Sequence, residues 1–163
     1  MLSRRDMLKG SLAAAAIGAT ASTVFVPLHA NAKAPLTGTQ VPGYYRLMVG
    51  DVEITALSDG TGQFPLADLY LNTSPEHART ALANAFQGTP TFTSVNAYLL
   101  NFGDRLVLLD AGSGDFLGPQ LGKLPANIRA SGYKPEQIDD IVLTHIHTDH
   151  SGGLILNDKA IYP

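Results

Sequence analysis

The sequence predicts an α/β fold in which helices cover a central sheet. Stretches typical of strands, rich in β-branched and aromatic residues, alternate with two stretches that carry helix start and stop residues. The chain has 163 residues, of which 45% are hydrophobic, and is therefore long enough to bury a core. Strands and helices in this order indicate a layered α/β sandwich. In such folds the functional residues commonly lie in the loops that leave the strand ends.

The first 32 residues are predicted to be a signal peptide and not part of the fold. The paired Arg4 and Arg5 stand before an apolar, Ala-rich run, and an A-x-A cleavage site ends at Ala32. The arginine pair resembles the twin-arginine type, so the Tat translocase is the expected partner during export. A single transmembrane anchor is the alternative, but Gly18 and Pro27 interrupt the apolar run.

The composition limits the classes of function. Residues 33–43 are predicted to be a Pro- and Gly-containing tether, and residues 44–163 a domain that lies in the periplasm or is secreted, with no membrane contact after signal cleavage. The net charge of −3 and the lack of a basic patch give no reason to expect a nucleic-acid partner, so none is predicted. The chain has no cysteine, so any metal must be held by imidazole and carboxylate groups.

Two hairpins and a helix are expected in the first part of the domain. A Gly50-Asp51 turn separates two strand-like runs over residues 44–60. A helix begins at Pro75 with Ser74 as its N-cap, and Gly88 is expected to end it. A second hairpin over residues 94–112 turns near Gly103-Asp104.

The second half of the domain should lead into the candidate site. Residues 106–109 are apolar on both faces and therefore predict a central strand. A helix is expected between Pro119 and Gly132, although Gly122 and Pro125 weaken that prediction. Residues 138–145 predict a short buried strand that runs directly into a cluster of histidines.

The stretch LTHIHTDHSGG contains three of the five histidines of the chain, and these three span only six residues. Alternate side chains of an extended chain point to one side, so His145, His147 and Asp149 begin on one face. His150 breaks this alternation and must be carried round by a turn, which the Ser151–Gly153 segment can supply because glycine allows positive φ and close backbone approach. Two imidazoles therefore point to one position, and a carboxylate with a third imidazole points to a neighbouring one.

This set of ligands suits zinc best, with manganese, cobalt or iron as alternatives. Two adjacent metal ions that share a water lower its pKa toward about 7 and so produce a nucleophile at neutral pH. The spacing therefore predicts a dinuclear metal site and a hydrolytic reaction.

The segment THIHTDH resembles the H-x-H-x-D-H motif of the metallo-β-lactamase superfamily. Residues 42–60, 94–112 and 132–153 are most similar to the subfamily of methyl parathion hydrolase and related secreted lactonases and esterases. The resemblance implies the N-terminal half of an αββα sandwich. It also implies that His145 and His147 bind the first metal, and that Asp149 and His150 bind the second.

The resemblance further implies a proton-transfer role for Asp149 and a supporting role for Asp110. Asp110, in LLDAG, corresponds to an aspartate at a strand end beneath the site that orients a metal ligand. A simple turn-forming role for Asp110 before Gly112 is the alternative. His77 lies in a predicted helix and is expected to be a solvated or helix-facing residue, not a ligand.

The second half of the superfamily fold normally supplies a third histidine for the first metal, a bridging aspartate and a final histidine. The residues after His150 include no further histidine, and Asp158 is the only one among them with a carboxylate side chain. The resemblance therefore implies an N-terminal fragment, incomplete at its C-terminus and inactive as it stands.

The expected substrate is a small molecule with an ester-like bond. The resemblance favours phosphotriesters, followed by lactones or carboxylic esters, and β-lactams least. The relatives carry a pocket aromatic one position after Phe116, where this chain has Leu117, which weakens the case for aromatic phosphotriesters. A non-catalytic secreted metal-binding module or an inactive truncated fragment is the alternative, and a homodimer is compatible with the sequence.

Overall fold

The computed structural model describes residues 34–163. The chain divides into two units, Met1–Thr39 and Gln40–Pro163, and every helix and strand described below lies in the second unit. The predicted signal peptide, residues 1–32, lies outside the described residues. None of the helices in residues 34–163 is long and apolar enough to cross a bilayer.

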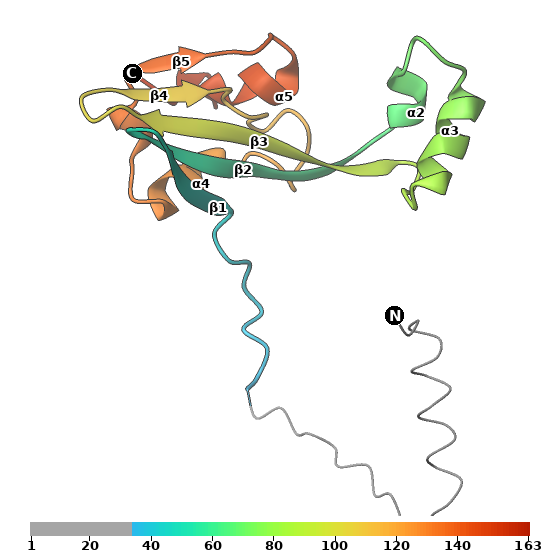
Figure 1. Cartoon of the computed structure of the whole chain (residues 1–163), viewed down its shortest axis with the longest axis horizontal. Coiled ribbons are helices and arrows are strands. Elements are labelled where there is room, and N and C mark those ends of the chain that lie inside the picture. The colour runs from blue at the N-terminus through green and yellow to red at the C-terminus, as the bar shows by residue number, and fades with distance from the viewer. Residues whose placement is uncertain (1–33) are drawn as a thin grey trace, which may run out of the picture. The chain divides into compact units, whose positions relative to one another are not determined.

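A five-stranded sheet forms the centre of the second unit (Figure 1). Its spatial order follows the chain from β1 to β5; the first four strands pair antiparallel, and β4 pairs with β5 in parallel. The strands are β1 (Tyr44–Val49), β2 (Val52–Phe64), β3 (Thr91–Asn101), β4 (Leu106–Leu109) and β5 (Asp140–Val142). This sheet with its helices confirms the predicted α/β class.

Short helices and a small hairpin complete the unit. Two of the helices, α2 and α3, follow β2 and precede β3 in the chain, and they lie at one end of these two long strands (Figure 1). The helices are α2 (Leu66–Leu69), α3 (Pro75–Asn84), α4 (Leu124–Ala130) and α5 (Thr148–Ser151), with 3₁₀ turns at Pro135–Gln137 and Gly152–Leu154. The small hairpin is formed by β6 (Ile155–Leu156) and β7 (Lys159–Ala160).

The core lies on the face of the sheet that α4 covers. Leu57 of β2, Leu99 of β3 and Leu108 of β4 are at most 1% exposed and point to this face, where Leu124 and Ile128 of α4 pack against them. Burial of each such side chain contributes about 1.5–3 kcal/mol to folding. The remaining members of this core cluster are Ala97, Ala111, Ile138 and Tyr162.

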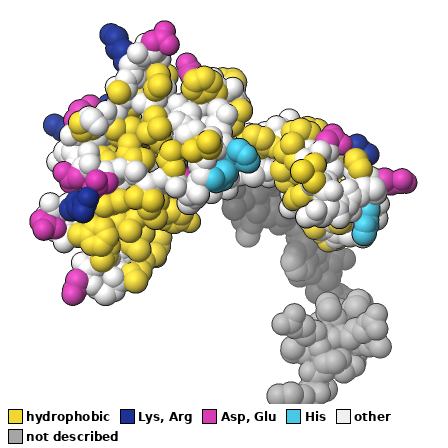
Figure 2. All heavy atoms as spheres, turned by 90° about the horizontal axis from the view of Figure 1, so that it is seen from above, with side chains coloured by type: hydrophobic (Ala, Val, Ile, Leu, Met, Phe, Trp, Pro, Cys, Tyr) yellow, Lys and Arg dark blue, Asp and Glu magenta, His cyan; other side chains and the backbone are white. Residues whose placement is uncertain are grey.

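The opposite face of the sheet is largely uncovered in the described chain. Tyr45, Tyr98 and Val142 lie on this face in register with Ala56 and Leu109, and they are 69%, 45% and 50% exposed. Figure 2 shows hydrophobic side chains gathered over this part of the molecule. Within residues 34–163, these three side chains therefore stay exposed to solvent.

Both predicted hairpins are confirmed. The turn between β1 and β2 consists of Gly50 and Asp51, and Gly50 has a φ of +59°, as a two-residue turn with glycine first requires. The second hairpin turns through residues 102–105, where Gly103 has a φ of +96°. β4 lies between β3 and β5, as expected of a central strand.

The helix α3 begins where the sequence predicts but ends earlier. Ser74 Oγ accepts a hydrogen bond of 3.1 Å from the backbone N–H of His77, which confirms the N-cap. The prediction that Gly88 ends the helix is wrong, because the last helical residue is Asn84. Phe86 takes the left-handed conformation that ends the helix, with a φ of +58°, and the N–H of Gln87 donates to Leu82 O in a Schellman-type closure.

Two further elements differ from expectation. The predicted helix start at Pro119 is wrong, since α4 begins at Leu124; positive φ angles at Gly118 and Gly122 keep the intervening segment non-helical. The predicted buried strand over residues 138–145 is shorter, because β5 covers only Asp140–Val142 and forms an edge of the sheet with partly exposed side chains.

Candidate metal centre

The clustered histidines lie in the loop that leaves β5 and in the short helix α5 that follows it. His145 and His147 precede α5, whereas Asp149 and His150 lie inside it. His147 O accepts hydrogen bonds from the backbone N–H groups of His150 and Ser151, at 2.9 and 3.0 Å, which closes the turn. The extended alternation predicted for the cluster therefore holds only to His147, and a helical turn places Asp149.

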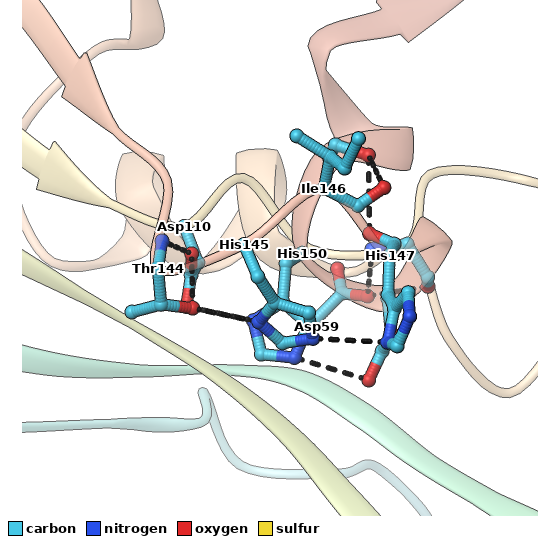
Figure 3. Close-up of polar contacts among 10 residues, drawn as sticks. Asp59, Asp110, Thr144, His145, Ile146, His147 and His150 are labelled. Carbon is cyan, nitrogen blue, oxygen red and sulfur yellow. Dashed lines mark hydrogen bonds and ion pairs between the residues drawn. The ribbon is translucent and has the colours of Figure 1, made fainter.

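The side chains of this segment converge. One ligand atom from each of His145, His147 and Asp149 lies within 4.8 Å of the other two. His145 Nε2 is 3.1 Å from His147 Nδ1, and the ring centroids of His145 and His150 are 3.9 Å apart (Figure 3). His145 and His147 are exposed, and Figure 2 shows a histidine patch open to solvent. The described chain thus contains a His/Asp cluster that could hold a metal.

Asp110 lies at the end of β4 and joins the cluster through His150. Its φ of +61° places it in the left-handed region, and its side chain is 10% exposed. The carboxylate accepts hydrogen bonds from Thr144 N at 2.8 Å, from Thr144 Oγ1 at 2.9 Å and from His150 Nδ1 at 2.8 Å (Figure 3). Burial raises the pKa of Asp110, but these hydrogen bonds from His150 and Thr144 outweigh it and leave the pKa below its usual value.

The contact with Asp110 determines the tautomer of His150. An ionised carboxylate only accepts hydrogen bonds, so the proton of a neutral His150 ring lies on Nδ1 and Nε2 carries a lone pair. That nitrogen is 3.2 Å from Asp149 Oδ2. A lone pair and a carboxylate oxygen at this distance repel each other unless a second proton or a cation lies between them. Metal-binding histidines commonly donate one ring N–H to a carboxylate and bind the metal with the other nitrogen, as His150 could do with Asp110 on Nδ1 and a free Nε2.

Thr144 is a site residue that the sequence analysis missed. Its hydroxyl donates to Asp110, so it can accept from His145, whose Nδ1 lies 3.1 Å away. A proton on Nδ1 leaves His145 Nε2 as the open nitrogen of that ring. Threonine at a strand end has no distinctive sequence signal, and the residue is identified only by its contacts.

The two glycines after α5 allow close backbone approach, but not through positive φ. Gly152 has a φ of −61°, and a Cβ built on it would lie 2.5 Å from Ser113 O. A Cβ on Gly153 would overlap Ala111 O. The expected positive φ is therefore wrong, whereas the expected close approach is confirmed.

The other polar residues considered from the sequence lie elsewhere. His77 is exposed on α3 and contacts Thr73 Oγ1 at 3.2 Å, which confirms a helix-surface position. Asp158 is exposed in the turn between β6 and β7.

Two family models match the chain. Residues 90–160 match the model of the metallo-beta-lactamase superfamily, and residues 1–21 match the twin-arginine translocation pathway signal sequence. The chain therefore carries a Tat signal, which directs export across the membrane to the periplasm or the exterior. No curated protein sequence matches the chain.

Solved structures show the same fold. The hydrolase AbOPH of the beta lactamase superfamily is 39% identical with a TM-score of 0.68, over 77% of this chain and 43% of that one. AidC, a dizinc quorum-quenching lactonase, is 26% identical with a TM-score of 0.64, over 74% and 42%. A probable metal-dependent hydrolase from Staphylococcus aureus is 17% identical with a TM-score of 0.55, over 66% and 42%.

The chain spans less than half the length of each of these three structures. The matched residues 90–160 include β4, β5 and the whole histidine cluster. The chain thus has a metallo-beta-lactamase-type fold, and the family model and the structural neighbours together support its assignment to the metallo-beta-lactamase superfamily.

Proposed function

We propose that this chain is part of an exported, metal-dependent hydrolase that cleaves an ester-like bond in a small molecule. The observation that carries the proposal is the convergence of His145, His147 and Asp149, whose ligand atoms lie within 4.8 Å of one another. Imidazole nitrogen and carboxylate oxygen form a donor set that fits zinc, with manganese, cobalt or iron as alternatives. The likeness to AbOPH and to the dizinc lactonase AidC supports the same assignment.

We assign the four side chains to two zinc positions. His145 and His147, in contact at 3.1 Å, would hold the first ion, and Asp149 and His150, 3.2 Å apart, the second. When bound, such ions lower the pKa of a water molecule toward about 7 and polarise the bond that is cleaved. Asp149 would also take or return a proton at its free carboxylate oxygen, and Asp110 would fix the ring of His150 through Nδ1.

The remaining ligands are proposed to come from residues outside this chain. A catalytic zinc commonly has three protein ligands and an open position, and each pair described above supplies only two. The chain covers 43% of AbOPH and 42% of AidC, which leaves room for a second half of the fold. We therefore propose that the chain is the N-terminal part of a longer hydrolase and is inactive by itself.

The substrate class is proposed from the neighbours and from the loop beside the site. A lactone is supported by AidC, which is a lactonase, and a phosphotriester by the resemblance of the sequence to the methyl parathion hydrolase subfamily. Phe116 is 61% exposed, and its ring would be 3.1 Å from a Cβ built on Gly152. An apolar substituent of the substrate could therefore contact Phe116 next to α5.

Replacement of Asp149 by alanine in the full-length protein tests the proposed function. The substitution removes the anionic ligand assigned to the second position, so bound zinc should fall by about one ion per chain and hydrolysis by about a hundredfold or more. His77→Ala, which removes an exposed imidazole on α3, is the matched control and should change neither quantity. Bound zinc is measured by elemental analysis after dialysis. Turnover is measured with a phosphotriester and with a lactone as substrates.

Two outcomes would contradict the proposal in different ways. Two zinc ions and intact turnover in Asp149→Ala would show that the dinuclear assignment is wrong. Zinc bound tightly by the unsubstituted full-length protein, with no turnover of any phosphotriester, lactone or carboxylic ester, would instead indicate a non-catalytic metal-binding module.

A further inference from the structure

Asp59 is a fully buried carboxylate that lies outside the histidine cluster. It occupies an irregular position in β2, where the register with β3 shifts between Ser58 and Gly60. A bulge of this kind leaves one residue without a partner across the ladder and redirects its side chain. At Asp59 the side chain turns away from the strand pairing and toward the loop that joins β4 to α4.

The carboxylate of Asp59 holds both ends of that loop. Its Oδ2 accepts hydrogen bonds from Ser113 N at 2.9 Å, from Ser113 Oγ at 2.6 Å and from Gly122 N at 3.2 Å, and its Oδ1 accepts from Leu124 N at 3.0 Å. In residues 34–163 no Lys, Arg or His forms an ion pair with this carboxylate. These four hydrogen bonds therefore compensate the free-energy cost of removing the Asp59 carboxylate from water.

The first end of the loop approaches Asp59 closely. Gly112 has a φ of +74°, and a Cβ built on it would lie 2.6 Å from Asp59 Cγ. Only glycine fits this position without displacing the carboxylate. The backbone at residues 111–114 is consequently fixed against Asp59 on one side.

The same backbone contacts the histidine segment on its other side. Ala111 N donates to His150 O at 2.7 Å, and Gly153 N donates to Gly112 O at 2.9 Å. A Cβ on Gly114 would lie 2.8 Å from Gly152 O, so the two backbones touch there as well. Residues 110–114 therefore form a layer between Asp59 and α5, and Asp110 at the start of this layer holds the His150 ring.

We propose that Asp59 is a positioning residue for the metal centre. It acts through residues 110–114, which set the place of α5 and thereby of Asp149 and His150. The inference rests on the proposed metal-binding function but concerns a different residue, with no direct contact to any of the four assigned ligands. Its consequence is that the geometry of the cluster depends on a carboxylate in β2, far from the histidines in sequence.

Asp59→Asn in the full-length protein tests this inference. The amide keeps the size of the side chain but accepts at one oxygen only, so its NH₂ group must face at least one of the present donors. We expect hydrogen exchange in residues 110–124 and 148–154 of the metal-free protein to become faster. The dissociation constant for zinc, measured by chelator competition, should rise about tenfold, the lower end of the range for supporting residues of metal sites.

Two further variants make the test specific. Asp51→Asn changes an exposed aspartate in the β1–β2 turn and should leave zinc binding and exchange at both segments unchanged. Ser113→Ala removes a hydroxyl whose hydrogen bond goes to Asp59, so it should change both quantities in the same direction by a smaller factor. If Asp59→Asn does not fold, the inference is tested by Ser113→Ala alone, for which unchanged zinc affinity and unchanged exchange at residues 148–154 would overturn it.

Unchanged zinc affinity and unchanged exchange at residues 148–154 in a folded variant would overturn the inference, even if the variant were less stable. That result would mean that Asp59 supports only its own loop. A full-length wild type that binds no zinc would overturn the proposed function instead. In that case exchange at residues 148–154 in the metal-free variants would still decide whether Asp59 positions α5.

Discussion

At the scale of single residues, Asp110 connects the end of β4 to the histidine cluster through Thr144 and His150. It accepts from the backbone and hydroxyl of Thr144 and from His150, and it lies in the left-handed backbone region. The turn conformation considered for Asp110 from the sequence is observed, and it brings the carboxylate within hydrogen-bond distance of His150. Its function in metal binding remains a prediction.

Asp110→Asn should separate the charge of this residue from its shape. Asparagine tolerates the left-handed conformation at least as well as aspartate, so the turn at residue 110 should persist. Loss of the negative charge weakens the hold on His150 Nδ1, and zinc affinity should fall about 10- to 100-fold. Chelator competition measures the effect, and Asp104→Asn in the exposed β3–β4 turn is the control. Equal zinc affinity of the Asp110 variant and wild type would remove Asp110 from the site.

The candidate ligands could be proposed from the sequence because they are close together in it, whereas Asp59, far from them in sequence, could not. His145, His147, Asp149 and His150 lie within six residues, and their spacing alone indicates a shared site. Asp59, in contrast, contacts partners 54 to 65 positions away, in a loop whose path depends on the finished sheet. No periodicity or local spacing reports such a contact, so Asp59 and its link to α5 needed the structure.

At the scale of elements, caps and turns that depend on neighbouring residues were predicted better than helix boundaries that depend on tertiary contacts. The cap at Ser74 and the Gly50-Asp51 turn each depend on a few neighbouring residues, and both are confirmed. The end of α3 instead places Phe86, a residue unfavourable in the left-handed region, where glycine is usual. The start of α4 was misplaced because Asp59 accepts from Gly122 N and Leu124 N, a tertiary contact that holds the preceding segment out of the helix.

Gly153→Ala should show how closely α5 depends on the loop after β4. The new Cβ would overlap Ala111 O, a backbone atom that cannot move without breaking the contact between residues 110–114 and α5. The free energy of unfolding in denaturant should fall by about 1–3 kcal/mol, the usual range for overpacking, and zinc affinity should fall with it. Gly88→Ala is the control, since its Cβ would lie 3.4 Å from the nearest atom. If the two alanine variants proved equally stable, the close approach would not constrain the site.

At the scale of the whole molecule, the sheet has two faces of similar composition and unequal cover. The inner face packs on α4, whereas Tyr45, Tyr98 and Val142 on the outer face are about half or more exposed. Soluble proteins seldom leave a contiguous apolar surface of this kind open. The outer face is therefore expected to be covered in the full-length protein, as a second half of the fold would do.

Tyr98→Lys should have opposite effects in the two forms of the protein. In the chain 33–163 the lysine interrupts the exposed apolar face, so self-association in size-exclusion chromatography should decrease. In the full-length protein the same lysine would be buried without a partner and should lower the free energy of unfolding by about 3–5 kcal/mol. Tyr70→Lys, which changes a tyrosine of similar exposure at the end of α2, should be nearly neutral in both forms because that position lies outside the sheet. A full-length Tyr98→Lys variant as stable as wild type would show that the outer face of the sheet stays open to solvent in the complete protein.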